Sequence, residues 1–154
     1  GDPLLMTDLL IRPLVATDRE KWWGLWQGYI KFYKASVADD VSEVTWQRLL
    51  HEDVPAFCRV AEHSEHGVIA LMNYVLHLNL WTSKPVCYLE DLFTDPAVRG
   101  QGAGRALIES LKETGEQEDW HRIYWMTAKD NSTARALYDK LASETQWVRY
   151  DINL

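Results

Sequence analysis

Three glycines at alternate positions constrain this chain more than any other feature of its sequence. Gly100, Gly102 and Gly104 stand between an apolar run, residues 86–93, and a helical pattern. A Walker-type phosphate loop needs Gly-Lys-Ser/Thr, but Arg and Ala follow Gly104 here. A dinucleotide-binding loop needs G-x-G-x-x-G, and the spacing here is G-x-G-x-G. The spacing therefore excludes both of these loops.

The position of the glycines between a strand and a helix leaves two interpretations. The first turn of a helix has backbone N–H groups without acceptors and carries the positive end of the helix dipole. Glycines ahead of such a turn keep side chains away, so that a diphosphate can approach these N–H groups. A tight strand-to-helix turn that binds nothing explains the glycines equally well.

The hydrophobic pattern predicts an α/β protein of one domain. The chain has 154 residues, of which 47% are hydrophobic, so it can bury a sizeable core. The expected order β-α-α-β-β-β-α-β-α-β implies a central mixed sheet flanked by helices. The run 86–93 is typical of a central strand covered on both faces. The expected strands are 9–14, 57–62, 68–78, 86–93, 123–127 and 147–152. The first expected helix follows a cap at Thr17 or Asp18 and carries the aromatic residues between positions 22 and 33. The other expected helices are 44–50 with a cap near Ser42, 103 to about 114, and 131–141.

Charge and cysteine content narrow the classes of function. The formal net charge is −7, which disfavours nucleic acid as a partner and suits a cationic acceptor. No stretch is long and apolar enough to span a membrane. Cys58 and Cys87 form no disulfide framework, so we expect a reduced, cytoplasmic protein. The five histidines show no spacing typical of metal ligands, and we expect no metal site.

Two carboxylates, Glu90 and Asp91, interrupt the apolar run 86–93. Adjacent residues of a strand face opposite sides of a sheet, so one carboxylate can face a cleft while the other pairs elsewhere. A buried carboxylate needs a partner or a raised pKa, which makes both residues candidates for a functional site. An alkyl ammonium must lose a proton before it can act as a nucleophile, and either carboxylate can accept that proton. A structural ion pair or a cap-like contact is the alternative, and the sequence does not choose between the two residues.

An aromatic stripe runs along the first expected helix. Trp22, Trp26, Tyr29 and Tyr33 follow one another at spacings of four, three and four residues, which puts them on one face. Core packing is the simplest role for this face. Because aromatic rings also hold cations, Trp26 and Tyr29 are candidates, together with Glu90, for binding a cationic amine.

The glycine segment resembles the phosphate loop of a known superfamily. Its run Arg99-Gly100-Gln101-Gly102-Ala103-Gly104 fits the Arg/Gln-x-x-Gly-x-Gly/Ala signature of the GCN5-related N-acetyltransferases. The resemblance extends through residues 88–93, resumes at 131–138, and fits the element order from about residue 8 to residue 152. It implies a single acetyltransferase domain over residues 1–154 that uses acetyl-CoA and no metal. The run Tyr88-Leu89-Glu90-Asp91 is similar to that of polyamine acetyltransferases and of histone-acetyltransferase-like bacterial members.

The resemblance implies roles for the residues that match the family's motifs. The N–H groups of residues 100–105 would hold the pyrophosphate, and Arg99 and Arg105 would meet phosphates or stay solvated. The end of the preceding strand would pair with the pantetheine arm and direct an N–H at the thioester oxygen, where it stabilises the developing oxyanion. The implied cofactor-binding residues are Leu92, Phe93, Thr94, Arg99, Gly100, Gln101, Gly102, Ala103, Gly104, Arg105, Asn131 and Ala134.

Tyr138 and Asn131 lie about two helical turns apart, with Ala134 between them. The resemblance implies that Tyr138 protonates the departing CoA thiolate, and a phenol with a pKa of about 10 is protonated at neutral pH. A core tyrosine with a satisfied hydroxyl is the alternative, and Asn131 is also a good helix cap. The family often places a glycine soon after this tyrosine. Residues 139–146 contain none, so the helix end and the last strands are expected to run differently.

The resemblance implies an N-acetyltransferase that transfers the acetyl group directly to the primary amine of a small molecule, such as a polyamine or an amino acid. Both substrates would bind together, and no cysteine is placed for a covalent intermediate. The alternatives are an acyl-CoA-binding sensor that does no chemistry and an acetyltransferase for protein lysines or N-termini. Family members often form homodimers, which the residues here neither require nor exclude.

Overall fold

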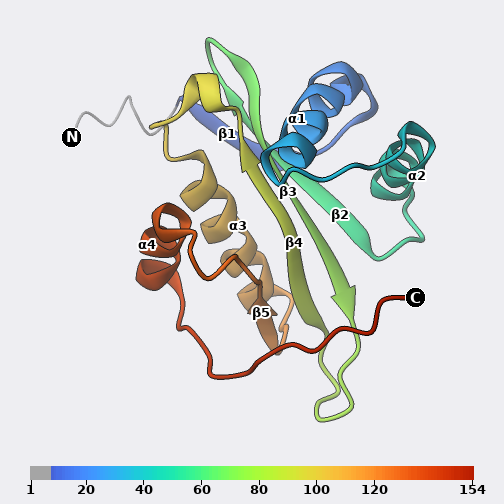
Figure 1. Cartoon of the computed structure of the whole chain (residues 1–154), viewed down its shortest axis with the longest axis vertical. Coiled ribbons are helices and arrows are strands. Elements are labelled where there is room, and N and C mark those ends of the chain that lie inside the picture. The colour runs from blue at the N-terminus through green and yellow to red at the C-terminus, as the bar shows by residue number, and fades with distance from the viewer. Residues whose placement is uncertain (1–7) are drawn as a thin grey trace.

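A mixed sheet of five strands forms the centre of the structure (Figure 1). The computed structural model describes residues 8–154, so residues 1–7 of the expected domain lie outside the described residues. The strands are β1 (Leu9–Pro13), β2 (Ala56–His63), β3 (Gly67–His77), β4 (Val86–Thr94) and β5 (Arg122–Tyr124). They lie side by side in this order, with β4 and β5 parallel and the other neighbours antiparallel.

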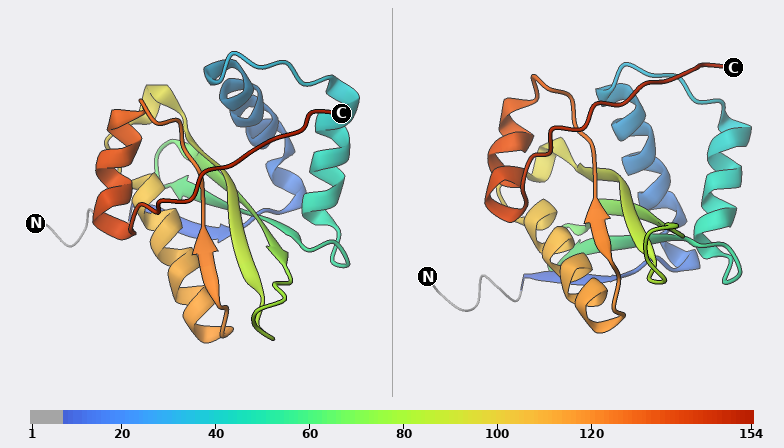
Figure 2. Two further views of the ribbon diagram at one scale, coloured as in Figure 1. Left: turned by 60° about the horizontal axis from the view of Figure 1, so that its bottom comes forward. Right: turned by 90° about the horizontal axis from the view of Figure 1, so that it is seen from below.

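Helices cover both faces of the sheet (Figure 2). α1 (Arg19–Phe32) and α2 (Asp39–Leu50) lie on one face, and α3 (Ala103–Gln117) and α4 (Ser132–Leu141) lie on the other. Leu71 packs in the core under α1 and α2, whereas the adjacent Met72 packs under α3, as neighbours in a strand do. The predicted α/β class, with a central mixed sheet flanked by helices, is confirmed.

A partly buried ion pair fixes the start of α1 to the sheet. The Arg12 guanidinium donates to both carboxylate oxygens of Asp18, at 2.8 and 2.9 Å, and Val15 N donates to the same carboxylate at 2.9 Å. The hydrogen bonds from Arg12 hold the pKa of Asp18 below its usual value, although burial opposes this effect. Because Asp18 is buried and accepts three hydrogen bonds, this partly buried pair constrains the position of α1.

The second helix begins earlier than its hydrophobic pattern predicts. α2 starts at Asp39 rather than at Val44, because Asp39 and Asp40 lie in its first turn, where carboxylates interact favourably with the helix dipole. The predicted cap, Ser42, lies inside the helix and is fully buried. Its Oγ accepts a hydrogen bond from Trp26 Nε1 at 2.9 Å, so Ser42 ties α2 to α1 instead of capping α2.

The predicted last strand, residues 147–152, does not form in the described chain. Residues 142–154 contain no helix or strand, and β5 ends at Tyr124 rather than at Thr127. The segment runs from α4 past β5 toward the side of α2 (Figure 2). Side chains two residues apart lie on the same side of this segment, as they do in a strand. Arg149 Nη2 donates to Asp151 Oδ2 at 3.0 Å. A strand also needs a ladder partner, and the adjacent β5 offers only three residues.

Candidate functional site

β4 and β5 diverge partway along β4, which leaves an open edge in the sheet. Their ladder ends at the pair Tyr88–Tyr124, whereas β4 continues to Thr94. Ladder hydrogen bonds alternate along an antiparallel strand, and Asp95 N donates to a carbonyl of β3 at 2.8 Å. The N–H groups of Leu92 and Thr94 therefore point away from β3, toward the open edge.

The side chains at this edge belong to the two cores. Leu92 packs with the core under α3, and Phe93 is buried in the core under α1. Only the backbone of these residues faces the edge, which is the group that an extended amide chain would pair with. The cofactor contacts implied for residues 92–94 are thus compatible with core positions of their side chains.

A β-bulge at Glu90 separates the two halves of β4. Asn73 pairs with Asp91 and the next residue of β3 pairs with Leu89, so that Glu90 has no ladder partner. A bulge re-aims the side chains beside it. Burial and the nearby charges of Asp91 and Glu90 raise the pKa of Tyr29 in α1. The expectation of strictly opposite faces for the two carboxylates is therefore wrong, because it assumed a regular strand.

Asp91 is the more buried of the two carboxylates. Burial raises its pKa, and two contacts oppose this effect: Asn73 Nδ2 donates to Asp91 Oδ2 at 3.0 Å, and the Tyr29 hydroxyl lies close to the carboxyl group. Glu90 is exposed at the bulge, and partial burial together with the charge of Asp91 raises its pKa as well. Both carboxylates therefore titrate closer to neutrality than usual, which suits a proton acceptor.

The glycine loop presents backbone N–H groups at the start of α3. Gly100 and Gly102 have φ values of 83° and 75°, a region that glycine adopts without strain. Nothing lies within 4 Å of the place that a Cβ would take at either glycine. Ala106 N is the first N–H of this helix with a backbone acceptor among the described residues, Gly102 O at 3.0 Å. The loop therefore has backbone N–H groups without acceptors, and open space beside them, at the positive end of the α3 dipole.

The loop, the open edge and α4 come together at Gly104. A Cβ at Gly104 would lie 3.9 Å from Leu92 Cδ2 in β4 and 3.9 Å from Leu137 Cδ2 in α4. The loop offers donors for a diphosphate, and the nearby edge of β4 offers donors and acceptors for an amide chain. These residues fit the diphosphate and the pantetheine arm of acetyl-CoA.

The other side chains of the loop contribute less than its backbone. The Ala103 side chain is buried in the core under α3, and its backbone N–H has no backbone acceptor among the described residues. Arg105 is exposed, and its Nε donates to Glu109 Oε1 at 2.8 Å, one helical turn further on. Arg99 and Gln101 are also exposed. The geometry therefore favours backbone N–H groups as the main anion donors of the loop.

α4 brings Asn131, Ala134 and Tyr138 to the same region. Asn131 caps the helix, since its Oδ1 accepts from Ala134 N at 3.4 Å. Tyr138 is half-buried and packs edge-on against Trp125, with ring centroids 5.4 Å apart. Burial raises the pKa of Tyr138, and Tyr33 of α1 adds to this effect, so Tyr138 stays protonated at neutral pH. Its hydroxyl has no hydrogen-bond partner within residues 8–154, unlike that of a satisfied core tyrosine.

The aromatic stripe forms a wall behind the acidic pair. Trp26 is buried, and its ring stacks on Tyr29 with centroids 5.8 Å apart. Tyr29 in turn meets Phe93 edge-on at 5.8 Å and lies beside Asp91. Of the two aromatic residues predicted to bind substrate, Tyr29 faces the acidic pair, and Trp26 supports it from the core.

Two residues of this region are absent from the site that the sequence predicts. Asn73 is the one strongly polar side chain in the otherwise apolar stretch 68–76, a signal that could have marked it. Tyr33 belongs to the aromatic stripe, and its ring centroid lies 5.1 Å from that of Tyr29. Tyr33 also lies close enough to Tyr138 to raise its pKa. The α1 face and the α4 face therefore meet where β4 and β5 diverge.

Both cysteines lie in the core, away from any nucleophilic role. They are unpaired and buried, and burial raises the pKa of the Cys87 thiol to about 12. A protonated thiol is a poor nucleophile. Within residues 8–154, no three His, Cys, Asp or Glu side chains are grouped to hold a metal ion. None of the described helices has the length and hydropathy needed to cross a membrane.

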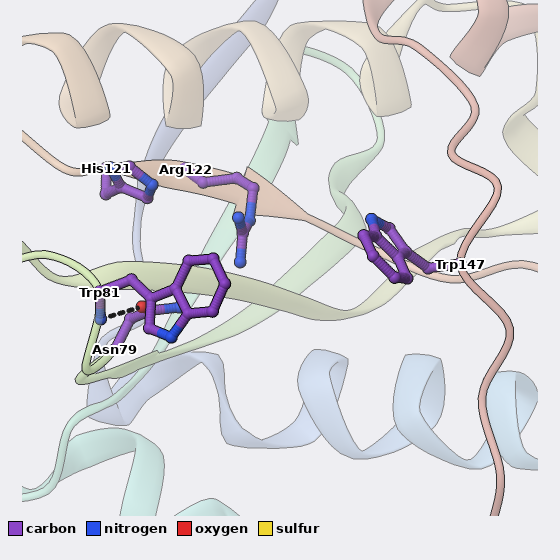
Figure 3. A pocket seen from close by; sticks show the side chains of 5 residues that line it. All are labelled: Asn79, Trp81, His121, Arg122 and Trp147. Carbon is purple, nitrogen blue, oxygen red and sulfur yellow. Dashed lines mark hydrogen bonds between the residues drawn. The ribbon is translucent and has the colours of Figure 1, made fainter.

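A hollow of about 400 Å³ lies at the start of β5, at the opposite end of this strand from the open edge (Figure 3). The indole rings of Trp81 and Trp147 stand on either side of Arg122, and both are more than 90% exposed. The hollow contains none of the predicted site residues. Its lining residues are Asn79, Trp81, His121, Arg122 and Trp147.

Known proteins match this chain over most of its length. The model of the acetyltransferase (GNAT) family matches residues 22–142. The D-amino-acid N-acetyltransferase HPA3 of Saccharomyces cerevisiae is 30% identical over 146 residues, which cover 94% of this chain and 91% of that protein.

Two solved structures share the fold at lower sequence identity. An aminoglycoside acetyltransferase from an uncultured soil metagenomic sample, in complex with trehalose, has a TM-score of 0.79 at 20% identity, covering 96% of this chain and 97% of that one. The aminoglycoside N-acetyltransferase AAC(6')-Iy in complex with CoA has a TM-score of 0.78 at 21% identity, covering 94% of each chain. The expected acetyltransferase fold is thus confirmed.

Proposed function

The chain belongs to the acetyltransferase (GNAT) family and is an acetyl-CoA-dependent N-acetyltransferase, and from this premise we propose that it acetylates the primary amine of a small molecule. The relative from Saccharomyces cerevisiae acts on D-amino acids and matches nearly the whole chain. Amino acids, the D-forms above all, are therefore the first acceptor class in our proposal. Polyamines are the second, because the acidic pair suits a cationic amine.

The strongest support is the meeting of three elements at Gly104. The loop supplies free N–H groups, β4 supplies an unpaired backbone edge, and α4 supplies Tyr138. When bound there, acetyl-CoA supplies an acetyl group activated as a thioester. The N–H groups of Leu92 and Thr94 face this edge, where a donor would stabilise the oxyanion that develops on the acetyl carbonyl.

The acceptor side of the proposed site lies under α1. An ammonium group beside Tyr29 would be held by the charges of Glu90 and Asp91 and by the aromatic ring. One of the carboxylates accepts a proton from the ammonium, which frees the nitrogen lone pair for attack. Tyr138 then gives its proton to the departing thiolate. No covalent bond to the protein is needed, in keeping with the two buried thiols.

An amino-acid acceptor also carries a carboxylate, for which Arg149 is the candidate partner. Its guanidinium contacts Met126 Sδ at 3.3 Å, just beyond β5. Burial and the charge of Glu90 raise the pKa of Tyr88, whereas Arg149 lowers it. A cation and a carboxylate therefore flank Tyr88, an arrangement that suits the two charged groups of one amino acid.

A panel of amines tests the proposed acceptor class. Release of free CoA thiol is measured with D- and L-amino acids, spermidine, an aminoglycoside and a lysine-containing peptide. We expect turnover on D-amino acids, and a higher KM for them, but not for spermidine, in the variant Arg149→Gln. Saturable acetyl-CoA binding without turnover on any amine would instead identify a sensor. Turnover on the peptide alone would identify a protein acetyltransferase.

We also propose that the protein is a cytoplasmic homodimer. The two unpaired, buried thiols are typical of a reducing compartment. The C-terminal side chains Trp147, Val148, Tyr150 and Ile152 are each at least 80% exposed. A second copy of the chain would remove this apolar surface from water.

A further inference from the structure

Asn73 occupies an unusual position for a polar side chain. It lies in the middle of β3, is only 4% exposed, and has apolar neighbours on its own strand. Its Nδ2 donates to Asp91 Oδ2 at 3.0 Å. Its Oδ1 is buried and has no hydrogen-bond partner among the described residues. The single contact that this amide makes is therefore the one with Asp91.

Burial of this amide is unfavourable by itself. A buried polar atom without a partner costs about 1–3 kcal/mol, and each such atom in a native structure calls for an explanation. An apolar side chain at this point of β3 would avoid that penalty and fit the neighbouring core. The hydrogen bond to Asp91 is the favourable interaction that offsets the unpaired side-chain carbonyl of Asn73.

The surroundings of Asp91 make this contact important. The groups that face Asp91 are Asn73 from β3, Tyr29 from α1, Cys58 from β2, and Glu90 and Tyr88 from its own strand. None of these groups is a cation. Asn73 is thus the amide that stabilises the ionised form of Asp91 against its burial, and it fixes one of the two carboxylate oxygens.

We propose that Asn73 is a positioning residue of the acceptor site: its amide holds one oxygen of Asp91, so that the other oxygen, rather than Glu90, accepts the proton that the acceptor ammonium must lose. In this step an N–H bond of the ammonium breaks and an O–H bond forms on Asp91, which later releases the proton to solvent. Glu90, exposed and without a ladder partner, attracts the cation but is not held in one orientation. The proposal rests on the acetyl transfer to an amine proposed above.

Two substitutions of Asn73 separate positioning from a merely structural role. Asn73→Leu keeps a similar volume but cannot donate, whereas Asn73→Thr keeps a hydroxyl donor. We expect Asn73→Leu to lower kcat/KM for the acceptor at pH 7 by about tenfold or more. The acidic limb of its pH profile moves to higher pH, because Asp91 loses the donor that favours its ionised form. Asn73→Thr recovers part of both effects, and the KM for acetyl-CoA is unchanged.

A ¹³C NMR titration measures the pKa of the Asp91 carboxylate and so tests its hydrogen bond with Asn73 without any turnover. We expect a higher pKa for Asp91 in Asn73→Leu than in the unmodified protein, and a smaller rise in Asn73→Thr, which also serves if the leucine variant fails to fold. An unchanged pKa and an unchanged acidic limb would overturn the proposal. So would an acidic limb that Glu90→Gln removes and Asp91→Asn retains. If no amine is turned over, the function proposed above fails, and the titration still decides the role of Asn73.

Discussion

The packing of Tyr138 explains both its protonation and its availability. Its ring rests on Trp125, burial keeps its pKa above the ordinary value, and its hydroxyl is free of partners within the described chain. We predict that Tyr138→Phe lowers kcat by about a hundredfold, since general acid catalysis contributes roughly 10²–10⁴-fold. The dissociation constant of acetyl-CoA, measured by calorimetry, stays within about twofold, because the ring packing is retained. Equal turnover of the two proteins would remove Tyr138 from the mechanism.

At the pH where Asp91 is ionised and can accept a proton, we expect it to lower the free energy of unfolding. Its pKa is raised in the folded state, so its contribution to stability is present at low pH and is lost as pH rises from the unfolded pKa through the folded one. We predict that Asp91→Asn unfolds about 2–4 °C higher at pH 8, the shift that about 1 kcal/mol produces in a chain of this size. The gain disappears near pH 4, and activity falls. Glu90→Gln, at an exposed position, serves as the control and should change the melting temperature little.

The sequence is informative about residue types and less so about their partners. Glu90 and Asp91 are conspicuous because polar groups in an apolar pattern need a reason, whereas the role of Tyr138 comes from the family resemblance. Asn73 gives the same signal, but its partner depends on the pairing of β3 with β4 and on the bulge at Glu90. No local pattern predicts where a bulge shifts a register, so the pair Asn73–Asp91 becomes visible only in three dimensions.

The loop before α3 depends on backbone conformation more than on side chains. Gly102 has a φ of 75° and immediately precedes the helix, and a Cβ there would meet no neighbouring atom. We predict that Gly102→Ala lowers the free energy of unfolding by about 1–2 kcal/mol through left-handed strain alone. It also weakens acetyl-CoA binding, because the strained loop no longer presents its N–H groups in the same directions.

A matched control for this prediction lies in α1. Gly24 is exposed in the helix and also has open space at its Cβ position, so Gly24→Ala should stabilise the protein by about 0.5–1 kcal/mol. Denaturant unfolding and calorimetry of both variants provide the comparison. A Gly102→Ala protein with unchanged stability and unchanged acetyl-CoA affinity would show that the loop conformation is unimportant.

The elements that the sequence predicts correctly are those with strong hydrophobic periodicity or clear local turn and cap residues. The central strand, the glycine turn, α3 and α4 all follow from periodicity and local signals. The sequence places the start of α2 too late because Ser42 resembles a helix cap, whereas its hydroxyl accepts a hydrogen bond from Trp26 of another helix. The expected element order closes with a strand over residues 147–152. Its failure to form reflects the short partner β5, which is a property of the sheet and not of the segment.

In the proposed function, the two substrates reach the site from opposite faces of one sheet. The proposed acceptor site lies under α1, and the proposed cofactor site lies between α3 and α4 (Figure 1). The two proposed sites approach each other where β4 leaves β5, since Tyr33 of α1 lies close enough to Tyr138 of α4 to raise its pKa. This arrangement favours direct transfer in a ternary complex, because both reactants reach one gap without a protein nucleophile between them.

Initial-velocity kinetics with the best acceptor of the amine panel test this central claim most directly. The concentrations of acetyl-CoA and of the amine are varied together, and the N-acetylated product is quantified by mass spectrometry against the CoA released. Direct transfer predicts intersecting double-reciprocal lines and one N-acetyl product for each CoA. Parallel lines, or CoA release without an N-acetylated product, would contradict it.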